Sequence, residues 1–469
     1  MLRFAHSQGS HDLAGCNTCL NMEARPAVPR RWRRAAALLV VVVWATGVWL
    51  YEVTGPRELV IVLLVCYLVI WAVAALVTRV SPRELGARFL LSTLGLLLVW
   101  TFFEAAAVVG LVDYRPLLGA PISEWWYATH YNVLDRELVY IHQPYLRLAG
   151  TQPGDIAATL CLRTPHYRYD VRYDGHGFRN PRDLTAADIA VIGDSFVEAP
   201  TVADDEVVTS VLAGLLGTTV ANLGMSAYGP QQELVILRRY ALPLLPRLIV
   251  WAFYEGNDLK DVGRYEEHIA APTTTSSMRF RFEASFARNV AHSLYRLLKG
   301  CQAPPGAAPR SGMFRDDLGR DVRMYFGAKN DPLSSADLQH LSVTHSVLRE
   351  AHDLSHRHGS RLLVAFVPTS FRVYKDLVRC PTDSDCDHAS VNDLPLRLQS
   401  IVGEIASDLG YVDLTPPFVE EARRGRLLYR PDDTHWTIDG HRVAAEVIAK
   451  ALTRNANARE ADVRGPAAR

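Results

Sequence analysis

Three long apolar runs in the first quarter of the chain limit what it can fold into more than any other feature of its sequence. They cover residues 35–53, 59–77 and 89–112 and contain almost no charged side chains. Each run is about as long as an α-helix must be to cross roughly 30 Å of hydrocarbon. We therefore predict three transmembrane helices within residues 35–112. Because a carboxylate is costly in lipid, Glu104 in the third run is expected to face the helix bundle or a polar partner.

Arginine residues at the ends of these runs predict the orientation of the chain. Residues 30–34 hold several arginines, and the segment 78–88 holds more of them than the loop 51–58. Basic flanks stay in the cytoplasm, so residues 1–34 are expected to form a cytoplasmic tail and the chain after about residue 113 to lie outside. The first run is interpreted as an uncleaved helix, because it is long, lacks a clear cleavage site and precedes two further runs. The sequence thus predicts a multi-pass protein of the cytoplasmic (inner) membrane with an extracytoplasmic, periplasmic domain.

Charge and cysteine content narrow the classes of function. The 50 basic and 50 acidic residues cancel, so no overall positive field would recruit nucleic acid. Cys380 and Cys386 bracket a polar loop in the expected outer part, where an oxidising compartment permits a disulfide between them. A second disulfide, between Cys161 and Cys301, is a weaker prediction. The "CNTC" motif of residues 16–19 lacks a second pair of ligands, so we expect no metal site there.

Apolar segments from residue 188 onward alternate between strand-like and helix-like patterns. Strands that alternate with helices indicate a parallel sheet covered by helices on both faces. We assign residues 188–453 to this α/β domain and residues 113–187 to a membrane-proximal extracytoplasmic region. The expected strands are 188–193, 218–224, 247–254, 361–368 and 411–414, and the expected helices are 205–217, 230–245, 335–357, 394–409 and 439–454.

An insertion interrupts the α/β domain at about residues 262–334. Its ends are rich in proline, serine, threonine and glycine, as loops are, but residues 280–300 carry apolar side chains at roughly helical spacing. This amphipathic helix either packs on the domain, or covers a cleft, or lies on the membrane surface. The last residues, 454–469, are expected to be disordered.

Polar residues follow the expected strands at one edge of the sheet. Ligands of open parallel sheets collect at the carboxyl ends of the strands. Ser195 follows the first strand, Gly224 ends the second and Asn257 follows the third. Asp432 and His435 lie together in a loop near the C-terminus. Ser195 alone would be interpreted as a helix-capping serine. Together with the other polar residues at this edge of the sheet, it predicts a site for nucleophilic catalysis.

A nucleophilic serine needs a base and an orienting acid. The hydroxyl is a weak nucleophile at neutral pH until a neighbouring imidazole takes its proton, and His435 is the candidate. A carboxylate must hold the other ring nitrogen. Asp432 and Asp433 compete for this role, and the spacing to the histidine favours Asp432.

The developing oxyanion needs preorganised N–H donors. Attack on an ester carbonyl places negative charge on its oxygen, and donors aimed at that oxygen stabilise the transition state. The backbone amides of Ser195 and Gly224 and the side-chain amide of Asn257 are the expected oxyanion hole. Gly224 suits this role because the lack of a Cβ lets the backbone approach a substrate.

Other charged residues beside these motifs have plainer interpretations. Asp194 and Asp258 are expected to hold loop geometry by hydrogen bonds rather than to transfer protons. Arg179, which follows a glycine turn, either binds an acidic group or pins that turn, and the sequence leaves both readings open.

In their order and spacing these motifs resemble the SGNH (GDSL-type) hydrolase superfamily. They are "GDSF" at 193–196, the glycine of "NLG" at 222–224, "GND" at 256–258 and a DxxH motif at 432–435. The resemblance covers about residues 185–453 and implies a three-layer α/β/α sandwich. It implies the same nucleophile, base, orienting acid and oxyanion donors that the strand ends predict. The tryptophan after "DDTH" adds a resemblance to the alginate-type polysaccharide O-acetyltransferases.

Together these observations predict a membrane-anchored serine esterase or O-acetyltransferase. An acyl group, most readily acetyl, would be hydrolysed from or transferred to a cell-envelope carbohydrate through an acyl-Ser195 intermediate. No cofactor and no metal are expected. The expected partners are an acylated envelope polysaccharide or another ester, the membrane, and for transfer a separate membrane protein that supplies the acyl group. The alternatives are a catalytically inactive SGNH fold that binds glycan or scaffolds an assembly, and a lipid or thioester esterase.

Overall fold

The computed structural model describes most of the chain after residue 80. It covers residues 81–112, 131–270, 285–299, 310–327, 332–382 and 390–464, together with the isolated positions 67, 71, 114, 118, 384 and 386. The predicted cytoplasmic tail and, apart from positions 67 and 71, the first two predicted spans lie outside the described residues. By its internal contacts the chain divides into two compact units, residues 1–81 and 82–469, and the second contains every helix and strand given below.

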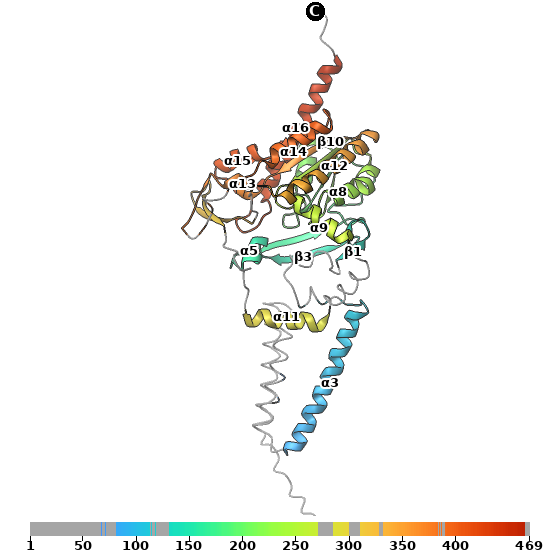
Figure 1. The fold of residues 1–469 in the computed structure, drawn as a ribbon, viewed down its shortest axis with the longest axis vertical. Coiled ribbons are helices and arrows are strands. Elements are labelled where there is room, and N and C mark those ends of the chain that lie inside the picture. The colour runs from blue at the N-terminus through green and yellow to red at the C-terminus, as the bar shows by residue number, and fades with distance from the viewer. Residues whose placement is uncertain are drawn as a thin grey trace, which may run out of the picture. The chain divides into compact units, whose positions relative to one another are not determined.

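The third predicted span is helical. Figure 1 shows it as helix α3. The helix (Pro82–Val108) begins and ends earlier than the predicted run of residues 89–112. Within the described part of the chain, its residues Arg83–Val108 form the one helix that is long and apolar enough to cross a membrane. Its side chains meet few neighbours, and Leu91 and Phe102 are 75% and 71% exposed. The described residues therefore contain one candidate span, and the three predicted transmembrane helices are not confirmed.

A five-stranded parallel sheet forms the centre of the α/β domain. The strand order is β12-β10-β7-β5-β6, and every neighbouring pair is parallel. All five predicted strands are confirmed. They are β5 (Ile189–Gly193), β6 (Val220–Gly224), β7 (Leu248–Tyr254), β10 (Arg361–Val367) and β12 (Gly410–Asp413).

Helices cover both faces of this sheet, as the alternation of side chains along β7 shows. Ile249, Trp251 and Phe253 belong to one apolar core with α8, α12 and α14, and Val250 and Ala252 belong to a second core with α7, α15 and α16. Successive side chains of a strand point to opposite faces of the sheet. The two cores therefore lie on opposite faces, and the helices that pack on them are the outer layers of a three-layer sandwich. The helices are α7 (Val208–Leu216), α8 (Pro230–Ile236), α12 (Ser335–Arg357), α14 (Leu394–Ile405), α15 (Thr415–Arg423) and α16 (Ile438–Arg464).

The region before the sheet forms small antiparallel pairs and packs on the sheet domain. Its elements are β1 (Asn132–Asp135), β2 (Val139–His142), β3 (Arg147–Gln152), α5 (Asp155–Leu160) and β4 (Tyr167–Arg172), with β1 paired to β2 and β3 to β4. Tyr140 of β2 and Phe178 are buried in the same apolar core as Trp251 of the central sheet. This region therefore shares its core with the α/β domain.

The insertion contains more regular structure than the sequence predicted. Helix α9 (Asp258–Ala270) runs into it, and α11 (Phe286–Lys299) is the predicted amphipathic helix. A hairpin of β8 (Ser311–Arg315) and β9 (Asp321–Tyr325) was not predicted, and β11 (Val378–Arg379) joins it as a third antiparallel strand. Its turn passes through Gly319 with φ of +74°, a conformation that favours glycine.

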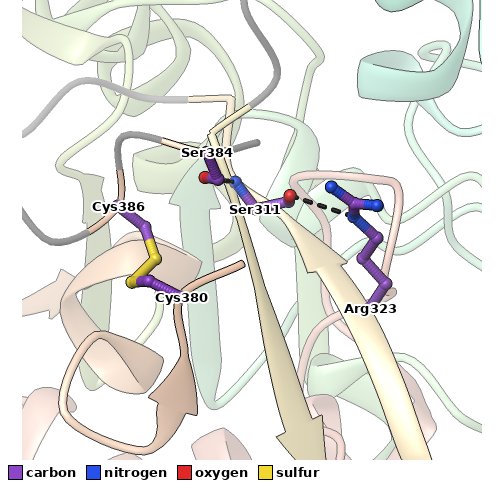
Figure 2. Close-up of a disulfide and its surroundings, with 5 residues drawn as sticks. All are labelled: Ser311, Arg323, Cys380, Ser384 and Cys386. Carbon is purple, nitrogen blue, oxygen red and sulfur yellow. Dashed lines mark hydrogen bonds between the residues drawn. A yellow bond between two sulfur atoms is a disulfide. The ribbon is translucent and has the colours of Figure 1, made fainter. Parts of the chain in front are cut away.

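The predicted disulfide lies beside this small sheet. Cys380 and Cys386 are bonded, as Figure 2 shows, and the loop between them reaches the hairpin through Ser384, whose hydroxyl accepts the Ser311 N–H at 2.8 Å. The Ser311 hydroxyl in turn accepts from Arg323 at 3.0 Å. Cys161 is also disulfide-bonded, whereas Cys301 lies outside the described residues.

The expectation of a disordered tail from residue 454 was wrong for most of its length. Helix α16 continues to Arg464. The segment after residue 454 is rich in alanine and arginine, which have high helix propensity, so an existing helix can extend through it. Residues 465–469 lie outside the described part of the chain.

Candidate active site

The nucleophile candidate lies at a tight turn between β5 and the short helix α6 (Ser195–Glu198). The Asp194 side chain accepts the Phe196 N–H at 2.9 Å and so begins the helix. A Cβ on Gly193 would lie 2.6 Å from the side chain of Val197, so only glycine lets α6 start this close to the strand. The Ser195 hydroxyl is 2.8 Å from Nε2 of His435. The structure thus brings together the predicted nucleophile and base across 240 residues of chain.

Asp433, not Asp432, contacts the other nitrogen of the ring. Nδ1 of His435 is 2.6 Å from Oδ1 of Asp433, which also accepts the His435 N–H at 2.9 Å. The preference for Asp432 was therefore wrong: its carboxylate accepts from the hydroxyl of Tyr167 instead. One cause is the pairing of each carboxylate with residues of the region before the sheet. The other is local, because an aspartate side chain in a turn accepts the backbone N–H two residues later. This contact holds Asp433 against the histidine.

Charge in this pair favours a negative acid and a positive ring. Burial disfavours both charged forms, but attraction to His435 lowers the pKa of the Asp433 carboxyl below its ordinary value. The Asp433 carboxylate likewise outweighs the effect of burial on His435 and raises the pKa of its imidazole to about 9. An acid of this kind stabilises the imidazolium that forms when the ring takes a proton.

A further carboxylate reaches the histidine loop from α5, and the sequence analysis missed it. Asp155 accepts the Thr434 N–H at 2.8 Å through Oδ1, and its own N–H donates to Asp433 at 3.3 Å. Burial and the nearby charge of Asp433 raise the pKa of Asp155 to about 6. Asp155 lies 278 residues before Asp433, and no local pattern marks it.

Within the described part of the chain, one group of side chains has the spacing of metal ligands. The ligand atoms of Asp155, Asp433 and His435 lie within 4.8 Å of one another. Both ring nitrogens of His435 already take part in hydrogen bonds, with Asp433 and Ser195. The geometry is therefore that of an acid–base–nucleophile chain, in which the histidine has no nitrogen to spare for a metal.

The loop after β6 contradicts the predicted role of Gly224 as an oxyanion donor. The Gly224 N–H donates to the side-chain oxygen of Asn222 at 3.0 Å, and the next amide, that of Met225, donates to the carbonyl of Gly193 at 3.0 Å. Glycine is needed here for packing, since a Cβ would lie 2.3 Å from the backbone nitrogen of Glu198. Both amides therefore serve the fold.

In the same loop, the backbone N–H of Ala227 is available to donate to a substrate. Ser226 donates its N–H to Glu198 at 2.6 Å, and Tyr228 donates its N–H to the carbonyl of Met225 at 3.2 Å. Among the described residues, the Ala227 N–H has no acceptor, and Ala227 is the one half-buried residue in an otherwise buried stretch. Its φ is +60°, which is unusual for a residue with a Cβ. The available donor of this loop thus lies three residues after the predicted one.

The other two predicted oxyanion donors remain compatible with the structure. Within the described residues, the Ser195 N–H meets no acceptor. Asn257 donates a side-chain N–H to Asp261 at 2.7 Å, and its amide also interacts with the Asp194 carboxyl. Asp258 accepts the Tyr254 N–H at 2.9 Å, and burial raises the pKa of its carboxyl well above the ordinary value. Like Asp194, it holds loop geometry, as predicted.

Arg179 binds an acidic group and also holds a turn, but that turn is the one after α6 and not the glycine turn beside Arg179. Its guanidinium donates to the carbonyl oxygens of Glu198, Ala199 and Val202 and pairs with Asp204. These acceptors follow α6 directly, so Arg179 fixes the chain where the nucleophile helix ends.

Comparison with known proteins identifies relatives for part of the chain. A family model described as the SGNH hydrolase-like domain of the acetyltransferase AlgX matches residues 318–467, which include Asp433 and His435 but not Ser195. The chain is 28% identical over 137 residues to a probable alginate O-acetylase AlgJ of Pseudomonas putida, covering 29% of this chain and 34% of that one. It is 26% identical over 136 residues to the AlgJ protein of Pseudomonas fluorescens, covering 29% and 32%. The matched segments thus span about a third of the length of these relatives.

Solved structures resemble the chain more distantly. An acetylxylan esterase from Geobacillus stearothermophilus is 12% identical, covering 58% of this chain and 95% of its own, with a TM-score of 0.30. A putative acylhydrolase from Bacteroides fragilis is 12% identical, covering 57% and 86%, with a TM-score of 0.29.

Proposed function

Since the chain carries an SGNH hydrolase-like domain with resemblance to the alginate-type O-acetyltransferases, we propose that it cleaves or transfers acyl esters through a covalent intermediate on Ser195. One observation supports this most: Ser195, His435 and Asp433 form a continuous hydrogen-bonded chain with distances of 2.8 and 2.6 Å. A nucleophile, a base and an orienting acid in this arrangement are what acyl transfer requires.

The first half of the reaction acylates the serine. The Ser195 oxygen attacks the ester carbonyl carbon while Nε2 of His435 takes the hydroxyl proton. The Asp433 carboxylate stabilises the resulting imidazolium. Negative charge on the carbonyl oxygen is met by N–H groups of Ser195, Ala227 and Asn257. When the carbon–oxygen bond to the leaving alcohol breaks, His435 returns the proton to that alcohol, and the acyl group stays on Ser195.

The second half regenerates the enzyme. Water or a carbohydrate hydroxyl attacks the acyl-Ser195 carbonyl, and His435 removes its proton. The serine leaves with the proton that His435 gives back. Water yields a free acid, so the protein acts as an esterase, whereas a sugar hydroxyl yields a new ester, so it acts as a transferase. Neither half requires a metal or a cofactor.

The proposed substrate is a cell-envelope polysaccharide. An esterase would act on its O-acetyl groups, and a transferase would acetylate its free hydroxyl groups. The names of the relatives point to acetyl groups on a polysaccharide, and an apolar helix precedes the domain. We place the domain on the outer face of the cytoplasmic membrane and the chain in that membrane as a multi-pass protein. Transfer would need an acyl donor, which a separate membrane protein would supply.

Active-site labelling tests the covalent step. The purified full chain in detergent should react with a fluorophosphonate probe and hydrolyse 4-nitrophenyl acetate, and Ser195→Ala should lose both. Ser210→Ala is the matched control. The Ser210 hydroxyl donates to the Asp204 carbonyl at 2.6 Å and lies outside the site. Equal labelling of the wild type and Ser195→Ala, or no labelling of either, would overturn the proposal.

Mass spectrometry separates the two outcomes of deacylation. Envelope polysaccharide from a strain lacking this protein is compared with that from a strain complemented by the wild type or by Ser195→Ala. Loss of O-acetyl groups in the deletion strain, restored by the wild type alone, indicates a transferase, and a gain indicates an esterase. An unchanged acetyl content in every strain would contradict the proposed polysaccharide substrate.

A further inference from the structure

The peptide group between Ser226 and Ala227 is held at its carbonyl oxygen by a buried tyrosine. The hydroxyl of Tyr140, a fully buried residue of β2, donates to the carbonyl oxygen of Ser226. That carbonyl and the Ala227 N–H belong to the same planar peptide. In a trans peptide the two point in opposite directions. A carbonyl drawn inward by Tyr140 therefore turns the Ala227 N–H outward, away from the core.

The neighbouring amide is anchored to the nucleophile helix. The Ser226 N–H donates to Glu198 at 2.6 Å, and Glu198 is the last residue of α6, which begins with Ser195. Glu198 is fully buried, and its carboxylate also accepts from Tyr173 at 2.5 Å and contacts Nε2 of His142 at 3.1 Å. Although burial disfavours the charge, His142 and these hydrogen bonds lower the pKa of Glu198 to about 2. A fixed negative charge thus ties the loop to the helix that carries the nucleophile.

The backbone of Ala227 needs such restraint. A residue with a Cβ in the left-handed region costs of order 1 kcal/mol or more. Without the two anchors at Ser226, the peptide could rotate toward a less strained conformation and turn the N–H elsewhere. Tyr140 is itself fixed, since its ring packs edge-on against Tyr228 at 5.4 Å and its carbonyl accepts from the Tyr228 hydroxyl.

We propose that Tyr140 is a positioning residue for ester cleavage, whose hydroxyl orients the Ser226–Ala227 peptide so that the Ala227 N–H meets the oxyanion formed at Ser195. This inference rests on the proposed function. It gives the segment that precedes the sheet a part in the chemistry, because the positioning hydroxyl comes from β2.

Tyr140→Phe removes only the hydroxyl and keeps the ring in place. In the full chain we expect kcat for 4-nitrophenyl acetate to fall about 10- to 100-fold, less than or equal to the loss of a whole oxyanion donor, with KM within about twofold. The rate of fluorophosphonate labelling should fall in parallel. Tyr411→Phe is the matched control, because its hydroxyl also donates to a carbonyl, that of Pro395 at 2.8 Å, away from the site.

The outcomes distinguish this inference from the function on which it rests. Both variants lose one phenol–carbonyl hydrogen bond, so a purely structural role predicts similar falls in Tm and an unchanged kcat per labelled Ser195 in each. A kcat for Tyr140→Phe within twofold of that for Tyr411→Phe overturns the positioning role, while Ser195→Ala still tests the covalent mechanism. Should Tyr140→Phe not fold, lactic acid in place of Ala227 removes the N–H itself. An unchanged kcat in that protein would equally overturn the inference.

Discussion

The charge on one imidazole, that of His435, is set by the carboxylates around it. Asp433 contacts its Nδ1 directly, and Asp155 lies behind Asp433 in the same buried group. The ring must be neutral to take a proton from Ser195, yet these carboxylates favour its charged form. Activity at a given pH therefore depends on the same contact that orients the ring.

Replacing the orienting acid should abolish most of the activity. Asp433→Asn keeps the shape of the side chain but can hold the wrong tautomer of His435, for which a loss of about 10⁴-fold in kcat is expected. Asp432→Asn is the matched control, because that carboxylate accepts from Tyr167 and does not touch the ring; a loss below about tenfold is expected from the small net worth of one such hydrogen bond. Steady-state hydrolysis of 4-nitrophenyl acetate measures both. Equal losses of kcat in Asp433→Asn and Asp432→Asn would contradict the assignment of Asp433 as the orienting acid.

The pH dependence of the reaction should be shifted to alkaline values. Because the pKa of His435 is raised to about 9, the ring is protonated below that pH and cannot act as a base. The value of kcat/KM should therefore rise with pH through the range above 7 and level off above about 9. In Asp433→Asn the midpoint of whatever activity remains should move to lower pH, since the raising charge is gone. A wild-type profile already level at pH 7 would contradict this assignment.

Among the elements, α3 and α11 are joined by one compact contact. The ring of Phe286, the first residue of α11, lies 4.8 Å from that of Trp100 and 5.1 Å from that of Phe103. Glu104, the acid in the third apolar run, accepts the Ala287 N–H at 2.9 Å. The first N–H groups of a helix have no acceptor within the helix, and negative charge is favoured beside them. Glu104 accepts one of these N–H groups, which gives the carboxylate the polar partner that the sequence analysis expected.

Removal of the Phe286 ring should loosen α11 without disturbing the sheet. Truncation of a packed aromatic side chain costs about 3 kcal/mol, and if this cost falls on local opening, amide exchange within residues 286–299 should speed up by roughly 100-fold. Hydrogen–deuterium exchange of Phe286→Ala measures this, with the amides of β7 as the internal reference. Tyr295→Ala on the same helix is the control, because that side chain is 56% exposed. Faster exchange in β7 as well would mean that the contact supports the whole domain.

At the scale of the whole molecule, the catalytic edge of the sheet is completed by segments from distant parts of the chain. Ser195 follows β5, His435 lies before α16, and Asp155 and Tyr140 come from the region before the sheet. The disulfide between Cys380 and Cys386 is of a kind that persists in oxidising compartments, in agreement with the proposed position outside the cytoplasm.

Reporter fusions test that position. Alkaline phosphatase fused after the C-terminus should be active, because the enzyme folds only outside the cytoplasm, where its disulfides form. The same reporter fused after residue 34 should be inactive if the first apolar run begins inside. An inactive C-terminal fusion with stable expression would overturn the orientation derived from the arginines.

The sequence by itself determined the layered α/β domain and two residues of the candidate active site, Ser195 and His435. Runs such as 248–254 are apolar throughout, as strands buried on both faces must be, so the strands and their parallel arrangement could be predicted. Ser195 and His435 could be predicted from neighbouring residues in the sequence. Ser195 follows a glycine turn after a buried strand, and His435 follows a pair of aspartates before a helix. The disulfide was readable because its two cysteines are six residues apart.

Only the tertiary structure decided which groups face the reacting atoms. Asp432 and Asp433 differ by one position, and the direction of each carboxylate is set by Tyr167 and Asp155 from another region of the chain. The N–H of Gly224 was a reasonable donor until its bond to Asn222 was known, and the role of Ala227 depends on a hydroxyl 86 residues from Ser226. Sequence patterns report periodicity and turn chemistry along the chain, whereas these choices depend on side chains that meet only after the chain has packed.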